Sequence, residues 1–109
     1  MNWTVLNTEE QLAEIINKSH SKAQVIFKHS IRCSISSMVK SRLEKSEAPD
    51  SIDFHYLDLI NFRSLSNKIA EDLNVYHESP QVLFIKDGEC IYDESHMAIR
   101  MDDIVEQVA

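Results

Sequence analysis

The sequence alternates between short apolar runs, typical of buried strands, and longer stretches whose apolar residues recur at helical spacing. The predicted strands cover residues 3–6, 23–27, 52–59, 81–85 and 90–92, and the predicted helices cover about 8–19, 34–46, 62–73 and 101–108. Strands that alternate with helices form a parallel sheet, and a final hairpin that turns at Asp87 and Gly88 adds antiparallel strands. The order β-α-β-α-β-α-β-β-α therefore predicts a mixed α/β sandwich.

Local signals mark where several helices begin, end and bury one side. Thr8 and Gln11 form a capping-box pattern at the start of the first helix, and Asn74 tolerates the left-handed conformation that ends the third. The apolar side of the second helix is expected to comprise Ile35, Met38, Val39 and Leu43. The apolar side of the last helix is expected to comprise Met101, Ile104, Val105 and Val108.

Composition limits the kind of molecule that this chain can form. Its 109 residues, 43% hydrophobic and 27% charged, suit one globular domain over residues 1–109. A formal net charge of −7 argues against nucleic acid as a partner, because nucleic-acid readers need a basic face. The chain has no apolar run of about 20 residues and does not begin like a signal peptide. We therefore expect a cytoplasmic protein with no membrane partner.

The two cysteines, Cys33 and Cys90, are predicted to be free thiols in a reducing compartment. Cys33 stands where a tight polar turn becomes a helix, so backbone N–H groups and the helix dipole favour its thiolate. Lys28 and Arg32 add positive charge nearby in the sequence. Cys33 is therefore a candidate nucleophile. Cys90 follows the hairpin turn and is expected to be a core or half-buried strand residue away from the active-site end.

Other polar residues suggest weaker sites. Among the histidines, only His29 and His77 could join Cys33, and this loose trio falls short of the roughly four ligands of a zinc site. No metal site is therefore predicted, and His29 is expected to be a strand-end residue that packs near the thiol. Asp58 is expected to be a solvated or strand-end charge, and a buried acid that shuttles protons is left open at either Asp53 or Asp58.

Three features of the chain resemble a thioredoxin fold, a three-layer sandwich with helices on both faces of a mixed sheet. They are the element order, the cysteine at the start of the helix after the second strand, and Ser79-Pro80 before the fourth strand. This likeness covers nearly the whole chain. More narrowly, Phe-Lys-His-Ser at residues 27–30 followed by Cys-Ser-Ile-Ser at residues 33–36 is similar to the YtxJ family, the monothiol bacilliredoxins of bacillithiol-using bacteria.

The resemblance implies a monothiol reaction through Cys33. The Cys33 thiolate would attack a protein–bacillithiol mixed disulfide, release the protein thiol and carry the small thiol, until a second low-molecular-weight thiol regenerates it. Ser36 stands where dithiol thioredoxins have a resolving cysteine, and its hydroxyl is expected to hydrogen-bond to the Cys33 sulfur. Bacillithiol would be a co-substrate, S-bacillithiolated proteins would be the partners, and no cofactor would be tightly bound.

The same resemblance implies a substrate-binding surface around the sulfur. Pro80 is expected to follow a cis peptide bond, and Ser79 would dock the substrate by backbone contact. Arg32 and Ser34 flank the sulfur and are expected to contact the same substrate. The family usually has threonine and proline at these two positions, so the resemblance indicates the type of chemistry but not the redox potential.

Two other functions stay open at this point. Cys33 and Ser36 share the outline of the Cys-Gly-Phe-Ser motif of monothiol glutaredoxins, which carry iron–sulfur clusters. Against that function, Ser34 replaces the motif's glycine, and the one glycine of the chain, Gly88, belongs to the hairpin. The third reading is a non-catalytic thioredoxin-like adaptor, which a fold likeness alone does not exclude.

Overall fold

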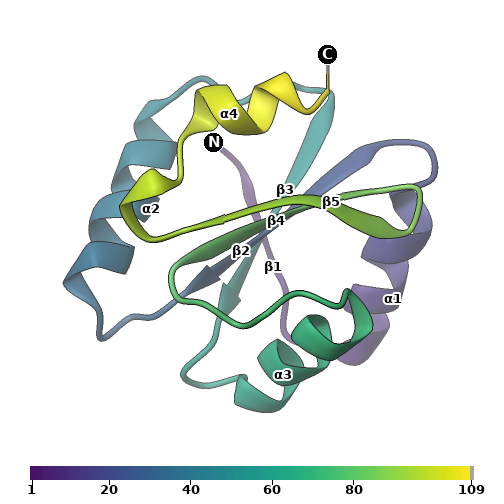
Figure 1. The fold of residues 1–109 in the computed structure, drawn as a ribbon, viewed down its shortest axis with the longest axis horizontal. Coiled ribbons are helices and arrows are strands. Elements are labelled where there is room, and N and C mark those ends of the chain that lie inside the picture. The colour runs from purple at the N-terminus through teal and green to yellow at the C-terminus, as the bar shows by residue number, and fades with distance from the viewer. Residues whose placement is uncertain (109) are drawn as a thin grey trace.

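Five strands form one mixed sheet at the centre of the fold, with helices on both of its faces (Figure 1). The structure is a computed structural model that describes residues 1–108; Ala109, the end of the expected 1–109 domain, lies outside the described residues. The elements are β1 (Trp3–Val5), α1 (Glu9–Lys18), β2 (Ala23–His29), α2 (Ser34–Lys45), β3 (Ile52–Asp58), α3 (Arg63–Asp72), β4 (Gln81–Lys86), β5 (Glu89–Ser95), the 3₁₀ helix η1 (His96–Ala98) and α4 (Met101–Glu106). The predicted element order is confirmed, with η1 added before the last helix.

The strand order in the sheet is β1-β3-β2-β4-β5. β1, β3 and β2 run parallel, β4 runs antiparallel to β2, and β5 runs antiparallel to β4. Two clusters of buried side chains place α2 and α4 on one face and α1 and α3 on the other. The first cluster includes Val39, Leu43, Met101 and Ile104, and the second includes Leu12, Ile15, Leu65 and Ile69. The predicted three layers are therefore present.

The local signals at helix ends and turns have the predicted geometry. The Thr8 hydroxyl accepts a hydrogen bond from the Gln11 N–H, and the Gln11 side chain accepts one from the Thr8 N–H, both at 3.1 Å. Asn74, just beyond α3, has a φ of 55°. In the β4–β5 hairpin, Asp87 and Gly88 both have positive φ, 53° and 81°, as a two-residue turn with the native strand twist requires.

The outward side of α2 is more apolar than the sequence predicted. Val39 and Leu43 are buried, but Ile35 and Met38 are 42% and 58% exposed. Ser36 is fully buried instead, because the helix is rotated so that Ser36, Val39 and Leu43 face the sheet. The prediction that Ile35 and Met38 belong to the buried side is therefore wrong.

β2 is two residues longer than predicted. Lys28 and His29 pair with Leu57 and Asp58 of β3, and both side chains are buried. A strand-end lysine is usually solvated, since lysine is almost never fully buried without a partner. The end of β2 is therefore an unusual polar region inside the fold.

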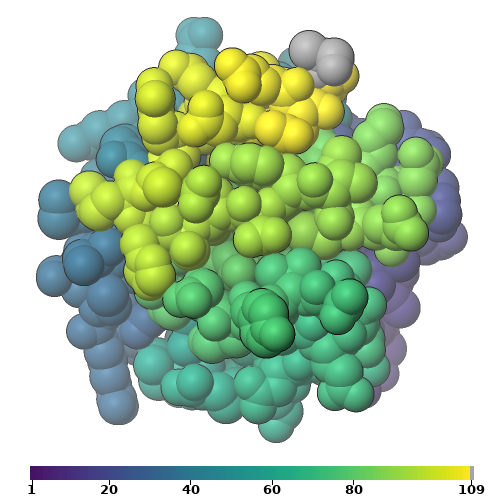
Figure 2. All heavy atoms as spheres, viewed as in Figure 1, coloured from purple at the N-terminus to yellow at the C-terminus, as the bar shows by residue number. Residues whose placement is uncertain are grey.

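The C-terminal part of the chain lies across the near side of the molecule in Figure 2, where β5, η1 and α4 form a yellow-green band. β5 is an edge strand, and exposed residues alternate with half-buried ones along most of it. In α4, Met101 and Ile104 are buried, whereas Val105 is partly exposed, and Val108, also partly exposed, lies beyond the end of the helix. Only part of the predicted apolar side is therefore in the core. Within residues 1–108, no helix is both long enough and apolar enough to cross a membrane.

Candidate functional site

Cys33 lies at the junction between the turn after β2 and the first residue of α2. It is the N-cap residue of α2, with extended backbone angles of φ −109° and ψ 119°. Its N–H donates to the Ser30 carbonyl (3.2 Å), and its carbonyl accepts from the Ser37 N–H (3.1 Å). The first N–H groups of a helix have no acceptor within the helix, and the side chain of Cys33, at the N-cap position, makes no capping hydrogen bond to them. Cys33 is thus half-buried at the uncapped amino end of a helix, between the exposed residues Arg32 and Ser34.

Ser36 lies in a buried hydrogen-bond network behind the Cys33 turn. Its Oγ accepts from the Ser30 N–H (3.0 Å) and lies 2.6 Å from His29 Nδ1. Because a hydroxyl has one proton, the arrangement that leaves no proton unpaired has Ser36 donating to Nδ1. The expected bond from Ser36 to the Cys33 sulfur is therefore replaced by a bond to His29. Ser36 ties the turn to the end of β2.

The His29 ring is held by aromatic neighbours as well as by Ser36. Its centroid lies 5.8 Å from that of Phe27 and 5.5 Å from that of Tyr56. Burial, followed by the positive charge of Lys40, lowers the pKa of His29, so the ring is neutral at pH 7. The expectation of a strand-end residue is confirmed, but the bond to Ser36 was missed. Periodicity shows which residues of one helix or strand share a face, so it gives no signal for a contact between residues on either side of a turn.

The charge of Lys28 is not directed toward the Cys33 turn. Side chains alternate along a strand, so Lys28 points to the α1/α3 face, on which Ile26 also packs. There its Nζ donates to the carbonyl of Ser66 in α3 (3.1 Å) and to Nδ1 of His77 (3.3 Å). Burial lowers the pKa of Lys28 to about 8. The expectation that Lys28 adds positive charge around the thiol is therefore corrected, and His77 contacts Lys28 instead of joining a trio with Cys33.

The Ser79–Pro80 peptide bond is cis, as predicted. Pro80 directly precedes β4, whose first residue, Gln81, pairs with Lys28 near the end of β2. The cis peptide bond thus lies near the carboxyl end of β2, the end at which the chain leaves this strand and turns toward Cys33. Ser79 Oγ is buried and has no hydrogen-bond partner within residues 1–108.

Cys90 lies toward the other end of the sheet. It pairs with Ile85 of β4, which pairs in turn with Gln24 near the start of β2. Burial raises the pKa of the Cys90 thiol to about 11, and its Sγ donates to the carbonyl of Tyr92 (3.3 Å). Cys33 and Cys90 are both free. The prediction that Cys90 is a core or half-buried strand residue away from the active-site end is confirmed: it is half-buried in β5.

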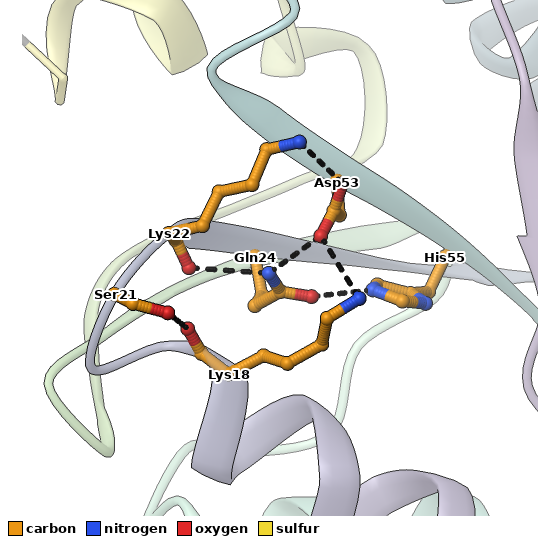
Figure 3. A network of polar contacts seen from close by, with 6 residues as sticks. All are labelled: Lys18, Ser21, Lys22, Gln24, Asp53 and His55. Carbon is orange, nitrogen blue, oxygen red and sulfur yellow. Dashed lines mark hydrogen bonds and ion pairs between the residues drawn. The ribbon is translucent and has the colours of Figure 1, made fainter.

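The two acidic candidates are engaged in local structure. Asp53, at the start of β3, accepts from Lys22 Nζ and Gln24 Nε2, both at 2.9 Å, in the network of Figure 3. Asp58 ends β3 and accepts from the Asn61 side chain (2.6 Å) in the turn that follows. Neither side chain is a buried acid, the role that the sequence left open for them. In the described part of the chain, no three His, Cys, Asp or Glu side chains gather where a metal ion could bind.

An apolar groove runs along the outer side of α2. Its volume is about 520 Å³, and it is lined by Ser37, Met38, Ser41, Arg42, Lys45 and Met97. Arg42 joins α2 to the segment around η1 by donating to the carbonyls of Met97 (2.9 Å) and Ile99. The groove begins one helical turn beyond Cys33. A larger cavity of about 650 Å³ lies beside Met1, and neither cysteine lines it.

The architecture and the site together define a class of protein. A mixed five-stranded sheet between helices, a cis-proline before β4 and a cysteine at the amino end of α2 are the features of a thioredoxin-fold protein, as the sequence resemblance implied. Residues 4–104 match the family described as Monothiol bacilliredoxin BrxC. The chain therefore belongs to the monothiol bacilliredoxin family.

Solved structures agree with this class. A structure described as a candidate oxidoreductase with a thioredoxin fold is 28% identical, with a TM-score of 0.84 over 96% of this chain and 92% of that chain. Thioredoxin from Malassezia sympodialis is 17% identical (TM-score 0.76; 98% of this chain, 88% of that chain). Thioredoxin from Trypanosoma brucei brucei is 14% identical (TM-score 0.80; 98% and 90%). The last two show the fold alone; the family match and the first structure support a thiol oxidoreductase-like role.

Proposed function

We propose that this protein is a monothiol thiol–disulfide oxidoreductase that removes bacillithiol from protein mixed disulfides through Cys33. The observation that carries the proposal is the unequal placement of its two thiols. Cys33 is half-buried at an uncapped helix start, whereas burial raises the pKa of Cys90 to about 11 at the other end of the sheet. Ser36 occupies the position of a resolving thiol and cannot form a disulfide, so the chemistry uses one sulfur. Membership of the bacilliredoxin family supports bacillithiol as the small thiol.

In the proposed reaction, the Cys33 thiolate attacks the bacillithiol sulfur of the mixed disulfide. The S–S bond of the substrate breaks as the new Cys33–bacillithiol bond forms, and the protein sulfur leaves as a thiolate that takes a proton from water. A second low-molecular-weight thiol, as its thiolate, then attacks the bacillithiol sulfur and returns Cys33 to its starting form. When this thiol is bacillithiol, the product is bacillithiol disulfide. A reducing compartment such as the cytoplasm would supply this thiol.

Four residues are assigned to substrate binding in this proposal. Arg32 and Ser34 are exposed on either side of Cys33, where a small thiol attached to the sulfur would lie. Ser79 and Pro80 precede β4, near the carboxyl end of β2, and their backbone would bind the protein part of the substrate. This division gives the two halves of the mixed disulfide separate contacts.

Mass spectrometry after exposure to oxidised bacillithiol tests the proposal. We expect one adduct, on Cys33, and release of bacillithiol from an S-bacillithiolated protein when bacillithiol is added. Cys33→Ser should abolish that release, and Cys90→Ser, the matched control, should leave it unchanged. Release by the Cys33→Ser protein at the wild-type rate would refute the assignment.

A further inference from the structure

Lys28 is a buried cation that the proposed reaction does not use. Its side chain is 0% exposed, and within residues 1–108 no ion pair joins it to a carboxylate. Burying an ammonium group without a counter-ion is costly, and a methionine would fill similar space without that cost. The hydrogen bonds that Lys28 makes are therefore the feature that a methionine would not supply.

Those hydrogen bonds join β2 to α3 and to the loop after it. Lys28 Nζ donates to the Ser66 carbonyl and to His77 Nδ1, and Ser66 Oγ also lies 3.3 Å from Nδ1. Burial, reinforced by the charge of Lys28, lowers the pKa of His77, so its ring is neutral and Nδ1 accepts. One ammonium group thus holds two segments that follow each other in the chain.

A second buried side chain holds the same loop. Gln81 is the register partner of Lys28 and is 1% exposed. Its Nε2 donates to the Tyr76 carbonyl (2.9 Å), and its Oε1 accepts from the Glu78 N–H (3.4 Å). Because register partners in an antiparallel pair point to the same face, Lys28 and Gln81 together hold residues 76–78 against the sheet. The loop then passes directly into the cis peptide bond before β4.

We propose that Lys28 is a positioning residue: with Gln81, it fixes the loop of residues 75–80 relative to β2, the strand from which the chain turns to Cys33. The inference rests on the proposed function, because it assigns to this loop the docking of the disulfide substrate. A loop that is already ordered costs the substrate less conformational entropy on binding. Lys28 should therefore act on the attack of Cys33 on a docked disulfide and not on the reactivity of the thiol itself.

Two reagents separate the effect on docking from the effect on thiol reactivity. Both are used in a Cys90→Ser background, where Cys33 is the one thiol that can react. Glutathione disulfide carries a peptide that the loop could dock, whereas iodoacetamide alkylates the thiol without docking. We expect Lys28→Met and His77→Leu to lower the rate constant with glutathione disulfide about tenfold, the size of one lost charge-assisted hydrogen bond. The rate constant with iodoacetamide should stay within about twofold. His77→Asn keeps an acceptor near the Nδ1 position and should retain the parent rate with both reagents.

Amide hydrogen exchange over residues 75–79 supplies a readout that does not depend on chemistry. Exchange should be faster in Lys28→Met and His77→Leu than in His77→Asn or in Lys22→Met, a control at the other end of β2. Lys28→Met and His77→Leu each remove the hydrogen bond between Lys28 Nζ and His77 Nδ1, from opposite sides. If only one of the two variants folds, that variant is sufficient for the test.

Two outcomes would overturn the inference. An equal fall with both reagents would mean that Lys28 acts on Cys33 itself, and an unchanged rate with glutathione disulfide would make Lys28 a structural residue only. Failure of the wild-type protein to release bacillithiol would refute the proposed function instead. The ratio of the two rate constants does not depend on that release.

Discussion

The two ends of β2 and β3 carry polar clusters of different character. At the amino end, Asp53 is the centre of a network that includes its own counter-ions (Figure 3). Its carboxylate accepts from Gln24 (2.9 Å) and forms ion pairs with Lys18 and Lys22. His55 Nε2 lies 2.7 Å from Gln24 Oε1, which completes the amide's contacts. Each of these groups has a partner of opposite charge or a hydrogen-bond partner, so this cluster is suited to stabilising the fold.

At the carboxyl end, the buried cation has no carboxylate partner among the described residues. Lys28 meets a carbonyl and a neutral imidazole, and His29 meets the Ser36 hydroxyl. These bonds hold the turn that carries Cys33 and the loop that precedes the cis peptide bond. The comparison indicates that the two ends of these strands have different roles. At the amino end, charged groups neutralise one another and stabilise the fold. At the carboxyl end, polar groups position the segment that carries Cys33.

The largest expected effect separates the thiols at the two ends. Because burial raises the pKa of Cys90 to about 11, about one molecule in ten thousand carries its thiolate at pH 7, against about three in a hundred for an ordinary cysteine. We expect iodoacetamide to modify Cys33 in the Cys90→Ser protein at least about 100-fold faster than Cys90 in the Cys33→Ser protein. Timed mass spectrometry measures both rates. In guanidinium chloride the two should converge, and similar rates in the folded state would contradict the comparison.

The next effect tests the amino-end cluster through pH. Burial lowers the pKa of His55 to about 4, below its ordinary value of 6.5, so the unfolded chain binds more protons between these values. The free energy of unfolding should therefore fall as pH drops from 6.5 to 4, by roughly 2–3 kcal/mol from this group. Urea unfolding of wild type and His55→Gln at pH 7 and pH 4.5 measures the difference. The variant should lose less stability on acidification, whereas the exposed His20→Gln control should follow the wild type. Identical slopes for all three would remove His55 from the explanation.

The smallest effect tests the carboxyl-end cluster. Ser36→Ala leaves the Ser30 N–H and His29 Nδ1 without their buried partner. We expect a loss of about 1–2 kcal/mol in the free energy of unfolding, measured with urea at pH 7. The exposed neighbour Ser37→Ala should change it by less than about 0.5 kcal/mol. A loss in Ser37→Ala as large as that in Ser36→Ala would assign the effect to the helix start in general.

Much of the fold and part of the site could be predicted from the sequence. The Thr8 cap, the left-handed Asn74 and the Asp87–Gly88 turn depend on backbone preferences and on partners within a few residues. The cis bond before Pro80 followed from the fold resemblance. The rotation of α2 could not be predicted in the same way, because Ile35 and Met38 satisfy helical spacing equally well whether that side packs on the sheet or faces solvent.

The sequence by itself determined the order of the elements, the turn that presents Cys33 and the lack of a second thiol three residues later. Only the tertiary structure decided what the polar residues around that turn do. Lys28 meets Ser66 and His77 across 38 and 49 residues of chain, and Ser36 bonds to His29 instead of the Cys33 sulfur. The physical reason is that local conformation depends on near neighbours, whereas a buried polar group depends on partners that folding brings from distant segments.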